Sequence, residues 1–417
     1  MKSWPALYLP DTSDIDFPEL RLNADRGIGD FSDLTNVRLY VCGITPYDAT
    51  HLGHAATYLT FDMISRYLIA TGKEVSFVEN ITDIDDPLLE RATRDGIDWE
   101  DLAGNQIDLF RADMTALHII PPQSFIAVTE VMPLVEAAIS QLRDRGFTYL
   151  VDQDTYFDIS SFLGDLPIPY EQALAIFAER GGDPDRVGKR NQLDPILWLS
   201  HREGEPSWPS VHGMGRPGWH IECSVIALRY LLGENFLTVS GSKSSLIDIQ
   251  GGGSDLVFPH HFMSGAQAQA LTGVPFSRSY IHAGMVGLDG QKMSKSLGNL
   301  VFVSKLLQSG RDAMAIRYAL LLDHYAADRM WSDEILQTAE SQIADIRSAL
   351  SREDLPDVTG LINSINLDLA DDLNTPSALA HLHQWSKELP SPDQYVISPG
   401  AGGRLARYLD AVLGLAL

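Results

Sequence analysis

The segment THLGHA, Thr50 to Ala55, carries two histidines and a glycine between an apolar run and a helical pattern. At the start of a helix, free backbone N–H groups and the positive end of the helix dipole attract phosphate. His51 and His54 can add hydrogen-bond donors there, and Gly53 admits a close approach. The segment therefore predicts a polyphosphate site, although two histidines that only cap a helix would give the same pattern.

A second candidate for phosphate chemistry is the segment GQKMSKSLGN, Gly290 to Asn299. Its two ammonium groups, on Lys292 and Lys295, lie among glycine and serine residues. Cations on a flexible loop can follow the charge that develops on a departing pyrophosphate. A solvated basic loop is the alternative for this segment taken alone.

The chain has only two cysteines, Cys42 and Cys223, and each lies in a glycine- or histidine-rich motif. A cytosolic chain disfavours a disulfide between them. Together with His260 they form a set of thiolate and imidazole ligands, each at a strand end or glycine turn, as a zinc site assembled from separate strands requires. A buried cysteine beside a capping histidine is the alternative.

The elements that must position these residues follow from the hydrophobic pattern. The apolar run from Val37 to Gly43 predicts a strand, residues 55–72 a helix, and Glu74 to Asn80 a second strand. Strand, helix, strand is a βαβ unit and implies a parallel sheet. LIDIQGGG and SYIHAGMVGLDG resemble further strands that end in glycines. We therefore expect an α/β fold with ligands at the carboxyl ends of its strands.

The middle and the end of the chain depart from this pattern. The pattern is interrupted by a helix around residues 130–144 and by the β-like string TYLVDQDTYFDI. Residues 178–192 should be a loop that rejoins the main domain. Residues 234–246 should be a surface loop. Beyond Leu300 the spacing predicts helices, with Thr375-Pro376 as a helix start. One helix face should carry Leu336, Ala339, Ile343, Ile346 and Leu350.

Composition limits the class of protein. A chain of 417 residues that is 45% hydrophobic and 21% charged is typical of a soluble globular enzyme. We see no signal peptide or membrane-spanning run, so a cytoplasmic protein without a membrane partner is expected. The net charge of -25 argues against broad binding to nucleic acid, and no nucleic-acid partner is expected. We expect a monomer or a weak dimer.

The two phosphate motifs together resemble the paired nucleotide-binding motifs of class I aminoacyl-tRNA synthetases. With YVCGITPYDATHLGHA, NITDIDD, GEPSWPS, GRPGWHIECS and GGGSDLVFPHH, the chain resembles cysteinyl-tRNA synthetase from about Val37 to Asn299. The resemblance implies a class I synthetase Rossmann-like parallel sheet with an inserted connective domain and a C-terminal helical domain. Four segments are expected: two halves of the catalytic domain in 1–125 and 191–300, a connective insertion in 126–190, and a stem-contact and helical region in 301–417.

The resemblance also implies ligands and residue roles. ATP would be a substrate, with Mg²⁺, and one Zn²⁺ would be bound by Cys42, Cys223 and His260, which leaves His261 as a supporting or core residue. His51, His54, Lys292 and Lys295 would be catalytic. Asp83, Asp85 and Asp86 are interpreted as cap and turn residues, because a calcium loop would need a glycine and a final glutamate. The cysteinyl-adenylate pocket would comprise Cys42, Gly43, Ile44, Thr45, Thr57, Asn80, Ile81, Thr82, Trp219, Gly253, Ser254, Asp255 and Val286.

The chain departs from the synthetases at three places. Ser264 stands where they have a fourth, glutamate ligand, Phe262 also replaces an acid, and the chain after Ser296 is shorter than their tail. The string AERGGDPDRVGK resembles another branch, the cysteine ligases of mycothiol biosynthesis. This branch implies ligation of L-cysteine to the amine of glucosaminyl-inositol. A shortened cysteinyl-tRNA synthetase is the alternative, and a synthetase-derived binding module is a third.

Overall fold

The computed structural model describes residues 1–25, 27–48, 50–238, 244–293, 298–389 and 391–417. Lys295 lies outside these residues, and so does the side chain of Lys292. At the centre is a parallel sheet with the strand order β11-β10-β3-β4-β5. Its strands are β3 (Asn36–Val41), β4 (Glu74–Ile81), β5 (Ser124–Ala127), β10 (Ile247–Gly253) and β11 (Ser277–Ala283). The predicted α/β fold is confirmed.

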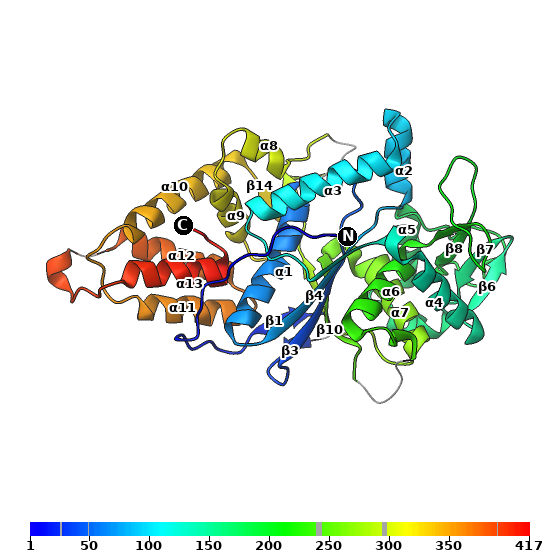
Figure 1. Ribbon diagram of the computed structural model, residues 1–417, viewed down its shortest axis with the longest axis horizontal. Coiled ribbons are helices and arrows are strands. Elements are labelled where there is room, and N and C mark those ends of the chain that lie inside the picture. The colour runs from blue at the N-terminus through cyan, green and yellow to red at the C-terminus, as the bar shows by residue number, and fades with distance from the viewer. Residues whose placement is uncertain (26, 49, 239–243, 294–297, 390) are drawn as a thin grey trace.

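Helices cover both faces of this sheet (Figure 1). Helix α1 (Leu52–Ala70) connects β3 to β4 and packs on one face, while α6 (Trp219–Leu232) and α7 (Phe262–Thr272) pack on the other. Side chains of β3 alternate between the two: Leu39 and Val41 belong to the core around α1, and Tyr40 to the core around α6. The strand ends are thereby held between two hydrophobic cores.

A smaller antiparallel sheet, β6-β7-β8-β9, is inserted between β5 and β10 and lies at the right of Figure 1. The predicted loop of residues 178–192 leads to β8 of this sheet, so the chain returns to the central sheet later than expected. The boundaries of the predicted domains stay a prediction. The elements of this connective insertion are α4 (Met132–Asp144), β6 (Thr148–Val151), β7 (Asp154–Phe157), α5 (Tyr170–Glu179), β8 (Ile196–Ser200) and β9 (Gly215–Pro217).

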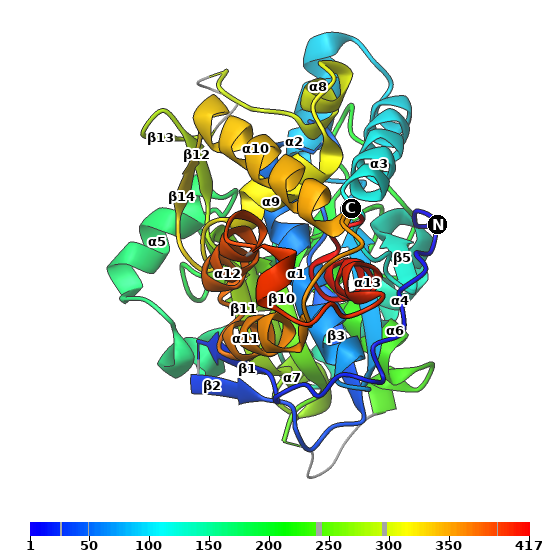
Figure 2. The same cartoon turned by 90° about the vertical axis from the view of Figure 1, so that its left-hand side faces the viewer.

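The end of the chain is mainly helical, as predicted, and α10 to α13 lie together at the end of the molecule opposite β6 and β7 (Figures 1 and 2). On α10 the predicted face is buried, except that Ala349 is buried in place of Leu350. The helix start predicted at Thr375-Pro376 is confirmed, and the cap of α12 is Asn374 and not Thr375, because the Asn374 side chain accepts the Ser377 N–H at 3.2 Å. The helices are α8 (Val303–Gln308), α9 (Ala313–Leu321), α10 (Asp333–Leu350), α11 (Thr359–Ala370), α12 (Thr375–Lys387) and α13 (Ala401–Leu413).

The remaining elements are short or peripheral. A small sheet of β12 (Val286–Leu288), β13 (Gln291–Lys292) and β14 (Arg329–Trp331) joins the second half of the main domain to the helical end. Strands β1 (Arg21–Ala24) and β2 (Gly27–Asp30) form a hairpin beside β11. Helices α2 (Asp86–Asp95) and α3 (Trp99–Ala116) follow β4 and precede β5 in the chain. Among the described residues, no helix is both long and apolar enough to cross a bilayer.

A buried cluster of charges ties α13 to the main domain. Asp62 on α1 pairs with Arg66 at 2.8 Å and with Arg317 of α9, and all three side chains are buried. Arg317 Nε donates to the carbonyl of Leu413 at 2.8 Å, and Arg66 Nη1 donates to that of Asp410 at 2.7 Å. Two buried guanidinium groups therefore rely on the backbone of the last helix for acceptors.

Candidate active site

Asn80 organises the carboxyl ends of β3 and β4. Its Oδ1 accepts from the backbone N–H of Gly43 at 2.9 Å and from the hydroxyl of Tyr40 at 2.8 Å. Its Nδ2 donates to Thr82 Oγ1 at 3.1 Å. A Cβ on Gly43 would lie 1.5 Å from the carbonyl oxygen of Asn80, so only glycine fits between the strands here. These predicted pocket residues thus meet at one edge of the sheet.

Cys42, Cys223 and His260 come together as predicted. Their Sγ and ring nitrogen atoms all lie within 4.8 Å of one another, and all three side chains are buried. His260 Nε2 is buried and has no hydrogen-bond partner. Its lone pair is therefore available to bind a metal ion. Two sulfur atoms and one imidazole suit Zn²⁺, for which three protein ligands leave a fourth position open. The residues present therefore fit the metal.

The elements that supply these ligands differ from the prediction. Cys42 does follow β3, but Cys223 lies in the second turn of α6, and His260 lies in the helical turn Val257–His261 before α7. The expectation of a site built from separate strands was therefore wrong for Cys223. Burial raises the pKa of the Cys223 thiol well above its usual range, so a thiolate here depends on a bound cation.

Imidazoles surround the group. His261 Nε2 lies 3.3 Å from Cys42 Sγ, and its Nδ1 lies 2.8 Å from Nε2 of His282, whose Nδ1 is 3.3 Å from Asp25. His220 Nδ1 lies 2.9 Å from His260 Nδ1. Burial lowers the pKa of His220 to about 3 and that of His261 well below the usual range, so both rings are neutral. His220 and His282 were not among the predicted site residues, although His220 lies in the string GRPGWHIECS and His282 in SYIHAGMVGLDG.

Trp219 and Ser264 complete the surroundings of the two histidines. The indole ring of Trp219 stacks on the imidazole of His260, with ring centroids 4.2 Å apart. Ser264 is fully buried, and its hydroxyl donates to the carbonyl of His261 at 3.3 Å and accepts from Gln250 Nε2 at 3.3 Å. The hydroxyl that replaces the synthetase carboxylate is thus engaged with two protein groups.

The histidines of THLGHA lie at the start of α1, but the expectation of free N–H groups there was wrong. His51 caps the helix, and its Nδ1 lies 3.1 Å from Gly53 N and 3.4 Å from His54 N. The Leu52 N–H donates to the carbonyl of Val301 at 2.9 Å. A Cβ on Gly53 would come within 2.9 Å of the His51 ring, so this glycine makes room for imidazole. The two imidazole rings stack with their centroids 3.7 Å apart, so a phosphate bound at this point would have to contact the rings and not free N–H groups.

The remaining predicted residues lie around the same edge of the central sheet, and only the two lysine side chains cannot be placed there. A Cβ on Gly253 would be 2.6 Å from Asp255 Oδ1 and 3.8 Å from Thr57 Oγ1, which places these three together. Ile44 and Ile81 are buried, Ser254 and Thr45 are partly exposed, and Val286 begins β12. Lys292 contributes a backbone pair with Gly287. Neither predicted lysine side chain lies in the described part of the chain.

The three acids of TDIDD have structural partners, in line with their interpretation. Asp85 caps α2 by accepting the Asp86 N–H at 2.9 Å. Asp86 pairs with Arg216 of β9. Asp83 is buried and accepts the N–H of Thr129 at 3.1 Å. The acids therefore join β4 to α2, to the connective insertion and to the turn after β5.

Comparisons with known proteins point to one family. The profile of the family described as "tRNA synthetases class I (C) catalytic domain" matches residues 30–341. An L-cysteine:1D-myo-inositol 2-amino-2-deoxy-alpha-D-glucopyranoside ligase of Gordonia bronchialis is 49% identical over 100% of both chains. The ligase of the same name from Streptomyces coelicolor is 50% identical over 91% of each chain.

Among solved structures, Mycobacterium tuberculosis methionyl-tRNA synthetase in complex with methionyl-adenylate is similar in fold. Its TM-score is 0.59 at 18% sequence identity, and the match covers 91% of this chain and 90% of that one. At this identity the likeness concerns the fold alone. It agrees with the class I synthetase architecture that the sequence motifs implied.

Proposed function

Because the chain belongs to the class I tRNA synthetase (C) catalytic domain family, we propose that it is an ATP-dependent, amide-forming cysteine ligase. It would join the carboxyl group of L-cysteine to the amine of glucosaminyl-inositol through a cysteinyl-adenylate, a step of mycothiol biosynthesis. We further propose that the reaction takes place in the cytoplasm, where ATP and reduced cysteine are available.

The observation that carries the proposal is the buried group of Cys42, Cys223 and His260. A zinc ion held by these three residues would bind the thiol of the substrate as a thiolate and bind the hydroxyl of serine far less well. Trp219, stacked on His260, gives the small amino acid an apolar wall. Gly43, which follows Cys42 in the chain and is fixed against Asn80, would border the bound cysteine.

In the first step, the carboxylate of cysteine attacks the α-phosphate of ATP, and pyrophosphate leaves. We propose that His51 and His54 donate hydrogen bonds to the departing phosphates and that Lys292 and Lys295 follow their charge, with Mg²⁺ bound to the nucleotide. Thr57, Gly253 and Asp255, which lie together, would hold the adenosine.

In the second step, the amine of glucosaminyl-inositol attacks the carbonyl carbon of the adenylate. The amide bond forms, the bond to the phosphate oxygen breaks, and AMP leaves. The amine must be neutral to attack, so its proton passes to a base or to water. The partners required are small molecules, and no nucleic acid takes part.

A shortened cysteinyl-tRNA synthetase would share the first step and use tRNA as the acceptor. The ligase is favoured because the relatives with full coverage carry the ligase name and because Ser264 replaces a carboxylate. The test is cysteine-dependent AMP formation with glucosaminyl-inositol and, separately, with tRNA. We expect stimulation by the amino sugar. Stimulation by tRNA alone would overturn the proposal.

A further inference from the structure

One hydrogen bond joins the connective insertion to the turn that carries His260. Arg180, directly after α5, donates from Nη1 to the carbonyl oxygen of Phe258 at 2.8 Å. Phe258 is buried, and its backbone angles, φ -141° and ψ 137°, leave the helical path of the turn. Its carbonyl therefore depends on a donor from outside the turn, because an unpaired buried carbonyl is costly.

The chain around Arg180 is shaped to present this side chain. Gly181 has φ +82°, a conformation that favours glycine. A Cβ on Gly182 would come within 2.5 Å of the Phe177 ring, so the second glycine is needed for the chain to turn back against α5. The string ERGG thus ends the helix with Arg180 aimed at the turn before α7.

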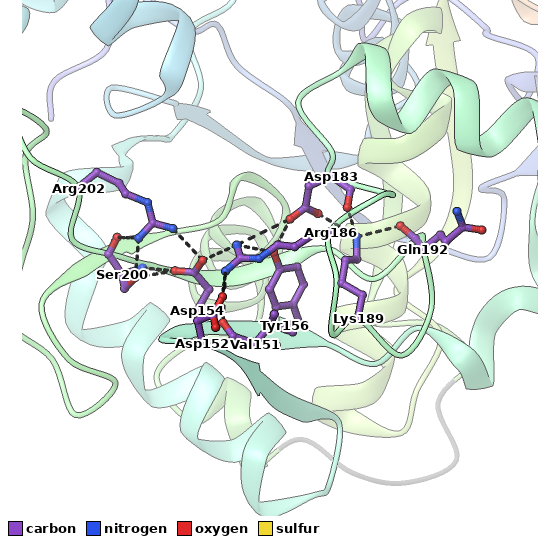
Figure 3. A network of polar contacts seen from close by, with 10 residues as sticks. All are labelled: Val151, Asp152, Asp154, Tyr156, Asp183, Arg186, Lys189, Gln192, Ser200 and Arg202. Atoms are coloured by element: carbon purple, nitrogen blue, oxygen red, sulfur yellow. Dashed lines mark hydrogen bonds and ion pairs between the residues drawn. The ribbon is translucent and has the colours of Figure 1, made fainter.

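The rest of the loop is fixed by charge pairs that each have one buried partner (Figure 3). Arg186 and Arg202 both pair with the buried carboxylate of Asp154 on β7, Arg202 at 2.8 Å. Lys189, whose side chain is almost fully buried, pairs with Asp183 at 2.8 Å and donates to the carbonyl of Gln192 at 2.8 Å. These contacts hold the loop from Asp183 to Gln192 in place directly after Arg180.

We propose that Arg180 is a positioning residue for the metal ligand His260. Its hydrogen bond fixes the backbone two residues before the ligand, while Trp219 and His220 contact the imidazole ring itself. The inference rests on the metal site proposed above. Groups that orient a metal ligand typically contribute about ten- to a hundredfold to metal affinity. The AERGGDPDRVGK string then links the insertion to the metal site.

The test is metal binding by the full-length protein, with Arg180→Met compared against Arg190→Met. Arg190 is a matched control from the same loop, where it pairs with Asp158 at 3.1 Å and lies 4.4 Å from the ring centroid of Tyr149. Zn²⁺ affinity is measured by competition with a chromophoric chelator, and the Co²⁺-loaded protein gives the thiolate absorption band. We expect R180M to bind Zn²⁺ about tenfold more weakly and to alter the Co²⁺ band. R190M should match the wild type, and Arg180→Lys should restore part of the affinity.

Unchanged Zn²⁺ affinity and an unchanged Co²⁺ spectrum in R180M would overturn the role of Arg180 and leave the proposed metal site intact. Wild-type protein that binds no Zn²⁺ would overturn the metal site and this inference together. If R180M does not fold, Arg180→Gln decides, because its shorter side chain cannot reach the carbonyl of Phe258. Weaker Zn²⁺ binding in R180Q then supports the role, and wild-type affinity rejects it.

Discussion

His261 Nε2 lies 3.3 Å from Cys42 Sγ, while its other ring nitrogen faces His282. Burial lowers the pKa of His261 far enough to keep the ring neutral, so one nitrogen carries the proton. With that proton on Nε2, the ring donates to the Cys42 sulfur, the atom that would bind the metal. His261 therefore contacts a predicted metal ligand directly, which favours the supporting role over that of a core residue.

We expect His261→Ala to weaken Zn²⁺ binding about tenfold, because the thiolate of Cys42 loses its donor. His261→Gln should bind more tightly than the alanine variant, since its amide can still donate. Chelator competition at constant pH measures both. Equal Zn²⁺ affinity in the wild type and H261A would contradict this role.

Cys223→Ala should abolish stoichiometric Zn²⁺ binding, because two ligands cannot hold the ion at micromolar protein. Zinc content after gel filtration checks this, with Ser224→Ala, its neighbour on α6, as the control. S224A should retain one Zn²⁺ per chain. Full zinc content in C223A would remove Cys223 from the site.

Ser264→Glu restores the carboxylate that the tRNA branch carries, and it should raise the KM for cysteine about tenfold, because the new ligand competes with the substrate thiol. The KM for ATP should stay near its wild-type value. Ser264→Ala, which removes only the hydroxyl, is the control and should leave the cysteine KM unchanged. A cysteine KM in S264E equal to that of the wild type would argue against an open metal position.

The capping of α1 by His51 and its proposed contact with phosphate can be tested separately. Asparagine is a good N-cap, so His51→Asn should keep the stability of α1, whereas His51→Ala should lose about 1 kcal/mol. Both variants should lose about a hundredfold in cysteine-dependent ATP–pyrophosphate exchange if the ring binds phosphate. Thermal unfolding and exchange assays together check this. Exchange in H51N at the wild-type rate would leave His51 with a capping role only.

Asp113 on α3 gives a prediction about pH. Burial raises the pKa of its carboxyl to about 7 from the ordinary 3.8, against a smaller opposing effect of Thr50. Between these values the folded protein holds a proton that the unfolded chain lacks, so stability falls as pH rises through this window. Asp113→Asn cannot ionise. We expect it to raise Tm by about 3 °C at pH 8 and to have no effect near pH 4. A gain of the same size at every pH would contradict this assignment.

The sequence predicted the sheet because its signals are local, and the metal group because its ligands stand in motifs that resemble those of the synthetases. Apolar runs such as the one before Cys42 end in glycine, and parallel strands bring such ends to one edge. Cys223 was misplaced because GRPGWHIECS contains two glycines that suggest a turn, whereas Gly218 is the N-cap of α6. Whether such a segment forms a turn or the start of a helix is decided by tertiary packing and not by intrinsic propensity.

Other features depended on contacts that no local pattern carries. The ring of His51 occupies N–H groups that any helix start would offer, and only its rotamer shows this. His282 reaches Asp25 across 257 positions of the chain, and Arg180 reaches Phe258 across 78. Such pairs are set by how the hairpin and the insertion pack on the main sheet.

The buried pairing of Asp62 with Arg66 and Arg317 also bears on the order in which the molecule can form. Both arginines donate to carbonyls of α13, which lie 344 positions after Arg66 and 96 positions after Arg317 in the chain. During translation the main domain can collapse, but its two innermost cations lack these acceptors until α13 leaves the ribosome. A chain synthesised only as far as Leu389 would therefore contain the whole central sheet and still leave two buried guanidinium groups short of hydrogen-bond acceptors.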